Sequence, residues 1–69
     1  MKLSARNQFK GKIIAIEEGA VNGIVQIDIG AGNVISATIS MASIKELGLA
    51  VGAEAYAVVK ATSVMVGVD

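Results

Sequence analysis

The sequence has no cysteine, no histidine, no proline and no tryptophan. Without cysteine the chain forms neither a disulfide nor a thiolate metal site, and without histidine it lacks the commonest transition-metal ligand and general base. No pair of carboxylates has the spacing that general acid–base catalysis requires. We therefore expect a protein that is not an enzyme and that holds no bare metal ion.

Charge and aromatic rings are also scarce. Six basic and six acidic residues give a net charge of zero, and the only aromatic residues are Phe9 and Tyr56. A nucleic-acid-binding surface generally needs a basic face and rings on which bases stack. The composition therefore argues against nucleic acid as a partner, although a nucleic-acid-binding module remains an alternative for the fold expected below.

The chain is short and apolar. It has 69 residues, of which 54% are hydrophobic, and its mean hydropathy is +0.66. From this length we expect one domain spanning residues 1–69. A domain of this size buries only about 60% of the surface of its unfolded chain and usually needs a further source of stability. With disulfides and metals excluded, assembly with copies of itself is the remaining source, so we expect a homo-oligomer.

No segment has the pattern of a membrane span or of a signal peptide. The longest uncharged stretch, residues 29–44, carries five polar side chains, which does not fit a transmembrane helix. The first ten residues, MKLSARNQFK, contain no apolar run of signal-peptide length. We expect a cytoplasmic protein with no membrane partner.

The hydrophobic pattern is mainly that of strands. Residues 9–18, 24–30 and 34–40 are rich in β-branched side chains or alternate between apolar and polar positions. Asn22-Gly23 and the segment GAGN at 30–33 predict the two intervening turns. The period then becomes helical, with Ser40 as a helix N-cap and Gly48 as a stop, which predicts a helix of about two turns.

The last apolar segment, residues 55–68, predicts one long strand or two short ones with a kink near residues 61–63. Together these elements indicate an all-β fold, an OB-like five-stranded barrel with one short helix between strands 3 and 4. A small open β-sandwich is the alternative. In the first strand Ile13 and Ala15 occupy one face and Ile14 and Ile16 the other. A barrel has one interior, so the second apolar face predicts contact with another subunit.

Three groups of hydrogen-bond donors suggest an anion site. They are the opening cluster around Ser4 and Arg6, the pair Ser40 and Ser43 at the expected helix start, and the segment Lys60–Ser63. A helix start offers unpaired N–H groups, hydroxyls donate, and Arg and Lys supply charge. Such a set suits a tetrahedral oxyanion, which needs many donors and few charges.

Each group also has an ordinary structural interpretation. Ser40 serves as a plain N-cap, Lys60 as a solvated lysine at a strand edge, and Arg6 as a surface charge or a subunit ion pair. Thr62 and Ser63 fit a strand bend. On spacing alone these interpretations are the stronger ones.

The chain as a whole resembles a known family. The segments SARNQFKGKI at 4–13, GAVN at 19–22 and YAVVKATSVMVG at 56–67 are similar to those of the molbindins, the small Mop proteins also called molybdenum-pterin-binding proteins. The same module is known as the TOBE domain. The resemblance implies an OB-like barrel assembled as a homohexamer, a trimer of dimers, which binds molybdate or tungstate between subunits and serves in storage or homeostasis of the oxyanion.

The resemblance also implies which residues contact the anion. They are Ser4, Ala5 (through its backbone), Arg6, Ser40, Ser43, Lys60, Ala61, Thr62 and Ser63. A second class of anion site is expected in this family, and we assign it to the turn at 19–23, with Gly19 and Asn22 as candidates. A pterin cofactor is doubtful because it would need aromatic stacking from Phe9 or Tyr56. An OB-type nucleic-acid-binding module and a purely structural oligomerisation module remain the alternatives.

Overall fold

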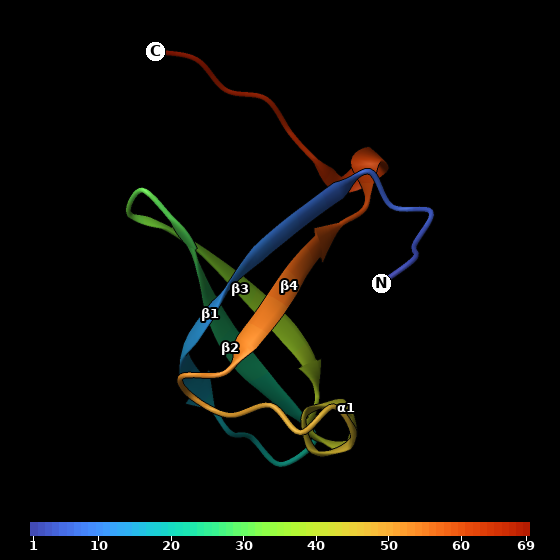
Figure 1. Ribbon diagram of the computed structural model, residues 1–69, viewed down its shortest axis with the longest axis vertical. Helices are drawn as coiled ribbons and strands as arrows, with labels where there is room; N and C mark the ends of the chain where they lie inside the picture. The colour runs from blue at the N-terminus through green and yellow to red at the C-terminus, as the bar shows by residue number, and fades with distance from the viewer.

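The computed structural model describes all 69 residues as four strands, one α-helix and one 3₁₀ turn (Figure 1). The strands are β1 (Asn7–Glu17), β2 (Asn22–Gly30), β3 (Asn33–Ser40) and β4 (Glu54–Val59). The helix α1 (Met41–Glu46) follows β3 directly, and the 3₁₀ turn η1 (Ala61–Ser63) follows β4. Neither helical segment has the length and apolarity needed to cross a bilayer.

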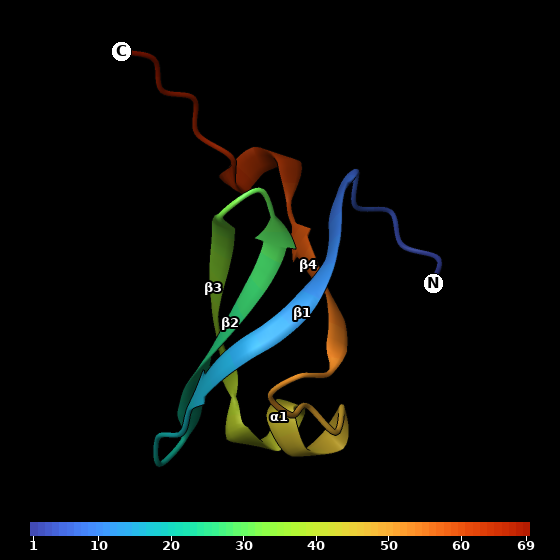
Figure 2. The ribbon, with the colours of Figure 1, turned by 60° about the vertical axis from the view of Figure 1, so that its left-hand side comes forward.

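The strands form one antiparallel sheet in the order β3-β2-β1-β4. The sheet curls into a half-barrel, with α1 closing the end at which β3 finishes (Figure 2). This confirms the expected all-β, OB-like class with a short helix between the third and fourth strands. The strand number differs from the expected five, because the chain ends its pairing at Val59.

The expected kink near residues 61–63 is present as η1. The residues after it were expected to continue as strand, but Val64–Asp69 belong to no element. They extend away from the sheet as a tail (Figures 1 and 2). A single chain therefore supplies four strands and one unpaired apolar segment.

A β-bulge in β1 corrects the predicted faces of that strand. Ile13 pairs with Ile27, but the next pair is Ala15 with Gln26, so Ile14 is the extra residue. The insertion reverses the alternation, and Ile16 comes to pair with the buried Val25. Ile13 and Ile16 thus share the inner face, whereas Ile14 is 43% exposed. The expectation that Ile16 lies on the outer face with Ile14 was wrong.

The core is small. Only six residues are buried, and five of them form the apolar cluster: Ile13, Val25, Ile27, Ile44 and Ala57. Fifteen large hydrophobic side chains remain exposed, which is a large number for a soluble chain of this length. Folding of one chain therefore buries only part of its hydrophobic side chains.

Asn22 and Gly23 do not form the predicted two-residue turn. Both lie in β2, where Asn22 pairs with Ser40 and Gly23 with Ile39, and neither has a positive φ. Gly23 is buried, and a Cβ at this position would lie 2.7 Å from Ile44 Cδ1 and 2.9 Å from Met41 Sδ. The glycine is needed because α1 packs directly onto the backbone of β2, which fixes the helix at this end of the sheet.

The second predicted turn is confirmed. Gly30 pairs with Asn33, and the two residues between them, Ala31 and Gly32, have φ values of 53° and 78°. Two consecutive positive φ values define the type I′ turn that matches the twist of a hairpin. Ala31 is the only non-glycine residue with a positive φ, so its Cβ makes this turn strained.

We expect Ala31→Asn to raise the free energy of unfolding by about 0.5–1 kcal/mol, because asparagine tolerates the left-handed conformation better than alanine. Chemical denaturation at fixed protein concentration measures the change. The control is Ala20→Asn, an exposed position with ordinary φ, which should change stability by less than about 0.5 kcal/mol. Equal effects at both positions would show that the backbone at Ala31 is not strained.

Candidate functional site

The first and third donor groups lie together at one end of the sheet. Ser4–Arg6 precede β1, Lys60–Ser63 follow β4, and the pairing of these strands begins with Asn7 opposite Val59. Residues from the two ends of the sequence therefore meet where β1 begins and β4 ends (Figure 1). We call these two segments, Ser4–Arg6 and Lys60–Ser63, the terminal donor group.

Two amide side chains fix the backbone beside this group. Asn7 Nδ2 donates to Val59 O at 3.2 Å, which ties the last residue of β4 to the first residue of β1. Gln8 Nε2 donates to Ala5 O at 2.7 Å, which fixes the segment that carries Ala5 and Arg6. The sequence shows Asn7 and Gln8 as members of one polar cluster, but it does not show that their amides hold backbone carbonyls.

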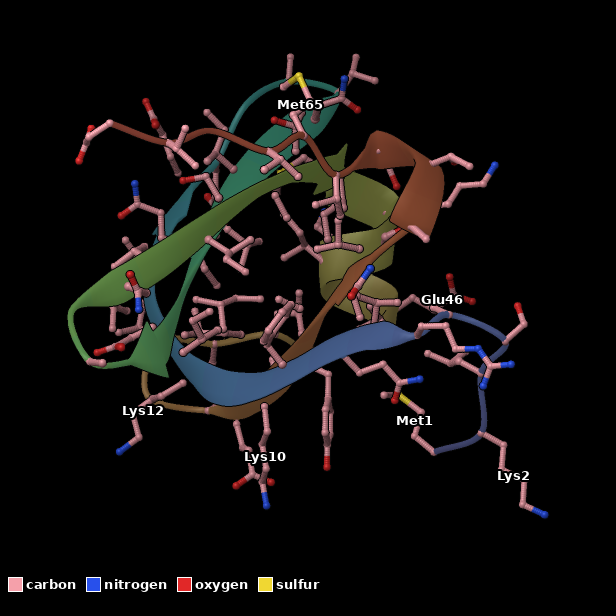
Figure 3. All side chains as sticks on the ribbon, turned by 90° about the horizontal axis from the view of Figure 1, so that it is seen from above. Met1, Lys2, Lys10, Lys12, Glu46 and Met65 are labelled. Carbon is pink, nitrogen blue, oxygen red and sulfur yellow. The ribbon has the colours of Figure 1, made fainter.

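The cations of the terminal donor group have no carboxylate partner within the chain. The one ion pair in the structure joins Lys10 Nζ to Glu54 Oε1 at 3.4 Å, and both side chains are more than half exposed. Lys10 points away from the sheet (Figure 3). Arg6 and Lys60 are exposed and keep their charges available for an external anion.

The turn η1 adds unpaired backbone donors. Its first hydrogen bond runs from Ser63 N–H to Lys60 O at 2.9 Å. The N–H groups of Ala61 and Thr62 therefore precede the hydrogen bonds of the turn, as in the first residues of any helical segment. Ala61, Thr62 and Ser63 are all exposed, so these backbone groups and the two hydroxyls are accessible.

Ser40 and Ser43 form a closed hydrogen-bonded pair at the start of α1. Ser40 Oγ accepts from Ser43 N–H at 3.0 Å and donates to Ser43 Oγ at 2.8 Å. The N-cap predicted at Ser40 is confirmed. Because the proton of Ser40 is used within the pair, the hydroxyl proton of Ser43 is the one left for an external acceptor.

This pair lies at the opposite end of the sheet from the terminal donor group. Ser40 ends β3 opposite Asn22, whereas Asn7 and Val59 begin the pairing of β1 with β4 at the other end. Figure 1 shows α1 and η1 at opposite ends of the half-barrel. Within one chain, two of the three predicted donor groups therefore lie at the same end of the sheet, and the third, the Ser40–Ser43 pair, lies at the opposite end.

The candidates for a second anion site lie at the α1 end. Gly19 and Asn22 line a surface cavity of about 280 Å³ together with Glu17 and Glu18. The turn also contacts the helix, since Met41 N–H donates to Val21 O at 2.8 Å. Two carboxylates on the same cavity repel an anion, so within one chain this turn favours an oxyanion less than the terminal donor group does.

Comparisons with known proteins agree over nearly the whole chain. The model of the TOBE domain family matches residues 3–66. A Haemophilus influenzae protein, named as a probable molybdenum-pterin-binding protein, is 68% identical over 69 residues, which is 100% of both chains.

Two solved structures are similar in both sequence and fold. MopII from Clostridium pasteurianum is 46% identical, with a TM-score of 0.91 that covers 97% of this chain and 100% of that one. The cytoplasmic molybdate-binding protein ModG, solved with molybdate bound, is 51% identical, with a TM-score of 0.83. That match covers 88% of this chain and 43% of ModG.

Mutation of the two serines is expected to have different effects on stability and on anion binding. Ser40→Ala should lower the free energy of unfolding by about 1 kcal/mol, because the helix loses its N-cap. Ser43→Ala leaves the cap in place and should change stability by less than about 0.5 kcal/mol, yet it removes the free hydroxyl proton and should weaken oxyanion binding. Urea denaturation and calorimetric titration measure the two effects. If Ser43→Ala left anion affinity unchanged, Ser43 would have no part in the site.

Proposed function

The chain belongs to the TOBE domain family, as one of its small molybdenum-pterin-binding (Mop) proteins, and on that premise we propose that it binds molybdate or tungstate at interfaces between identical subunits. The names of its relatives describe binding and no catalysis. We further propose that the binding serves storage or homeostasis of the oxyanion in the cytoplasm, the compartment named for ModG.

The observation that carries the proposal is the placement of the donor groups. The terminal donor group and the Ser40–Ser43 pair lie at opposite ends of one chain, so a single small anion does not contact both within that chain. Two chains placed so that the terminal donor group of one meets α1 of the other would surround the anion with donors. Each chain contributes both halves, which is the requirement for a closed symmetric assembly.

The chemistry of the donors fits a molybdate dianion. Molybdate at neutral pH has no proton to donate, so a suitable site presents donors and keeps free acceptors away from the oxygens. The terminal donor group supplies Arg6, Lys60, three hydroxyls and backbone N–H groups, and none of its residues carries a carboxylate. Phosphate is partly protonated at the same pH and would lack an acceptor. Tungstate has nearly the same size and charge, so we expect similar binding.

The assembly proposed is a homohexamer, a trimer of dimers. Its support is the small core of five apolar residues beside fifteen exposed large hydrophobic side chains. A structural oligomerisation module without a ligand would explain that exposure equally well. It gives no reason for Arg6 and Lys60 to flank the same residue pair, Asn7 with Val59, without a carboxylate partner, which is why we favour an anion-binding assembly.

Nucleic acid and pterin fit the structure less well. Phe9 pairs with Ala57 and Tyr56 pairs with Lys10. Because paired residues share a face and neighbours along a strand alternate, the two rings project from opposite faces of the sheet. They form no common platform on which a base or a pterin ring would stack.

Removal of either cation of the terminal donor group is expected to weaken molybdate binding roughly ten- to a hundredfold, which corresponds to one charge-assisted hydrogen bond of about 1.5–3 kcal/mol. Calorimetric titration of Arg6→Ala and Lys60→Ala measures the loss. Arg6→Lys should also bind less tightly if the guanidinium contacts two oxygens.

The matched control for the cations is Lys12→Ala. Lys12 is exposed in the middle of β1, opposite Asp28 and Glu54, and points away from the sheet (Figure 3). It should leave affinity unchanged. A loss at Lys12 equal to the losses at Arg6 and Lys60 would mean that binding follows overall positive charge, and the assigned site would be wrong.

Native mass spectrometry with and without molybdate tests the assembly. We expect six chains of 7.0 kDa with a fixed number of anions bound, and a higher melting temperature with molybdate or tungstate, because both bind only the assembled folded state. Sulfate at the same concentration is the control. A monomer that binds molybdate would overturn the interface sites, and a hexamer that binds no anion would favour the structural module.

A further inference from the structure

Side-chain amides hold two backbone carbonyls beside the terminal donor group. Asn7 Nδ2 donates to Val59 O at 3.2 Å, and Gln8 Nε2 donates to Ala5 O at 2.7 Å. A carbonyl oxygen accepts hydrogen bonds and never donates them, so a carbonyl turned toward an external anion would repel it. The two amides therefore hold groups that would oppose binding of the proposed ligand.

The carbonyls of η1 are held by the backbone instead. Lys60 O accepts from Ser63 N–H at 2.9 Å, and Ala61 O accepts from Val64 N–H at 3.4 Å. These bonds belong to the turn itself and do not depend on a particular side chain. The carbonyl of Ala5 differs, because its partner is one side-chain amide, that of Gln8. Gln8 is exposed, so its replacement removes this bond without opening the core.

The hydrogen bond of Gln8 also orients a donor. Ala5 O and the N–H of Arg6 belong to one peptide unit, and in a planar trans peptide the C=O and N–H bonds point in opposite directions. Since the amide of Gln8 holds the oxygen on one side, the N–H of Arg6 points to the other. Arg6 lies in no strand or helix, and its N–H makes none of the backbone hydrogen bonds outside these elements. This N–H is therefore free for an anion.

We propose that Gln8 is a positioning residue that sets the specificity of the oxyanion site, because it holds the Ala5–Arg6 peptide with its N–H toward the anion. The inference rests on the proposed function, since it concerns the same site. The amide of Gln8 is bound to Ala5 O, so Gln8 acts through this peptide and not by contact with the anion. Rotation of the peptide by half a turn would present the carbonyl in place of the N–H.

The two orientations of this peptide suit different anions. Every oxygen of molybdate at neutral pH is an acceptor, so molybdate binds an N–H and is repelled by a carbonyl. Singly protonated phosphate has the same charge, but its P–O–H group is a donor that needs an acceptor. A carbonyl in place of the N–H would therefore favour phosphate over molybdate. By holding the carbonyl away, Gln8 favours anions that carry no proton.

The side chains of the terminal donor group do not make this distinction. Those of Arg6 and Lys60 only donate, and the three hydroxyls donate or accept according to their rotation. A backbone carbonyl only accepts, so its direction decides which anion it favours. Of the carbonyls in the terminal donor group, that of Ala5 is the one held by a side chain. Gln8 is therefore the position at which a single replacement should change specificity.

The variant Gln8→Met tests the inference, because methionine keeps the length of the side chain but has no N–H donor. Calorimetric titration measures the affinity for molybdate, and displacement of molybdate measures the affinities for sulfate and phosphate. The titrations use a mildly alkaline pH, at which phosphate is mainly a dianion with one proton and sulfate is a dianion with none. We expect molybdate and sulfate to bind roughly tenfold less tightly, as for one lost hydrogen bond. Phosphate should bind as tightly as before or more tightly.

Gln26→Met is the matched control, since it makes the same replacement at the other glutamine of the chain. Gln26 lies in β2, opposite Ala15 and Ser36, and takes no part in the hydrogen bonds beside the terminal donor group. This variant should leave the ratio of phosphate affinity to molybdate affinity unchanged. Thermal melting followed by circular dichroism confirms that both variants are folded.

The proposal requires that this ratio rise roughly tenfold in Gln8→Met and stay constant in the control. Equal losses of molybdate and phosphate affinity would show that Gln8 only supports the local fold, and would overturn the proposal. A variant from which phosphate displaces no molybdate would overturn it as well. In both cases molybdate binding by the unmodified chain would leave the proposed function intact. An unmodified chain that binds no molybdate would overturn the proposed function and this inference together.

Discussion

The antiparallel pairing of β1 with β4 is the contact on which the candidate site depends. Its end pair, Asn7 with Val59, joins residues 52 positions apart, and the amide of Asn7 closes the pairing at the end where the donors lie. Arg6 and Lys60 flank the first residue pair, Asn7 with Val59, so this register places both at the same end of the sheet. A shift by one residue would turn the side chains of β4 to the opposite face. The same shift would expose Ala57 and would also move the two segments of the terminal donor group out of alignment. Stability of the core and placement of the donors are thus set by the same register.

At the other end of the sheet the decisive contact is between α1 and β2. Gly23 lets Ile44 and Met41 pack on the strand backbone, and Met41 N–H bonds to Val21 O. These contacts hold Ser40 and Ser43 at a fixed position beside β3. Each end of the half-barrel is therefore held by its own set of contacts, and each carries part of a donor set.

Much of this architecture follows from local sequence. The alternation in residues 24–30 and 34–40, the N-cap at Ser40, the stop at Gly48 and the turn at Ala31-Gly32 all depend on neighbouring residues, and the structure bears them out. Asn22-Gly23 and Ile16 were predicted wrongly, because a packing contact and a bulge decided them, and neither is a local property. The nine proposed anion contacts came from the pattern of donors together with the family resemblance, and they stay predictions.

Sequence reasoning also missed the roles of Asn7 and Gln8. Amide side chains near a strand start are common in surface loops, and only the three-dimensional positions of Val59 O and Ala5 O show that both amides bind carbonyls. The fate of residues 64–68 was missed for a different reason. Their composition is that of a strand, but a strand also needs an edge to pair with, and residues 64–68 pair with none in this chain.

The bulge at Ile14 divides β1 into two segments of opposite phase. In the segment before it odd-numbered residues face the core, and in the segment after it even-numbered residues do, as Ile13 and Ile16 show. Loss of the single residue Ile14 would restore an uninterrupted ladder but would shorten the strand between the donor end and the helix end by one residue. The bulge thus sets the spacing between the donor end and the helix end, and among homologous chains the length from Arg6 to Gly23 should vary less than the identity of the residues within it.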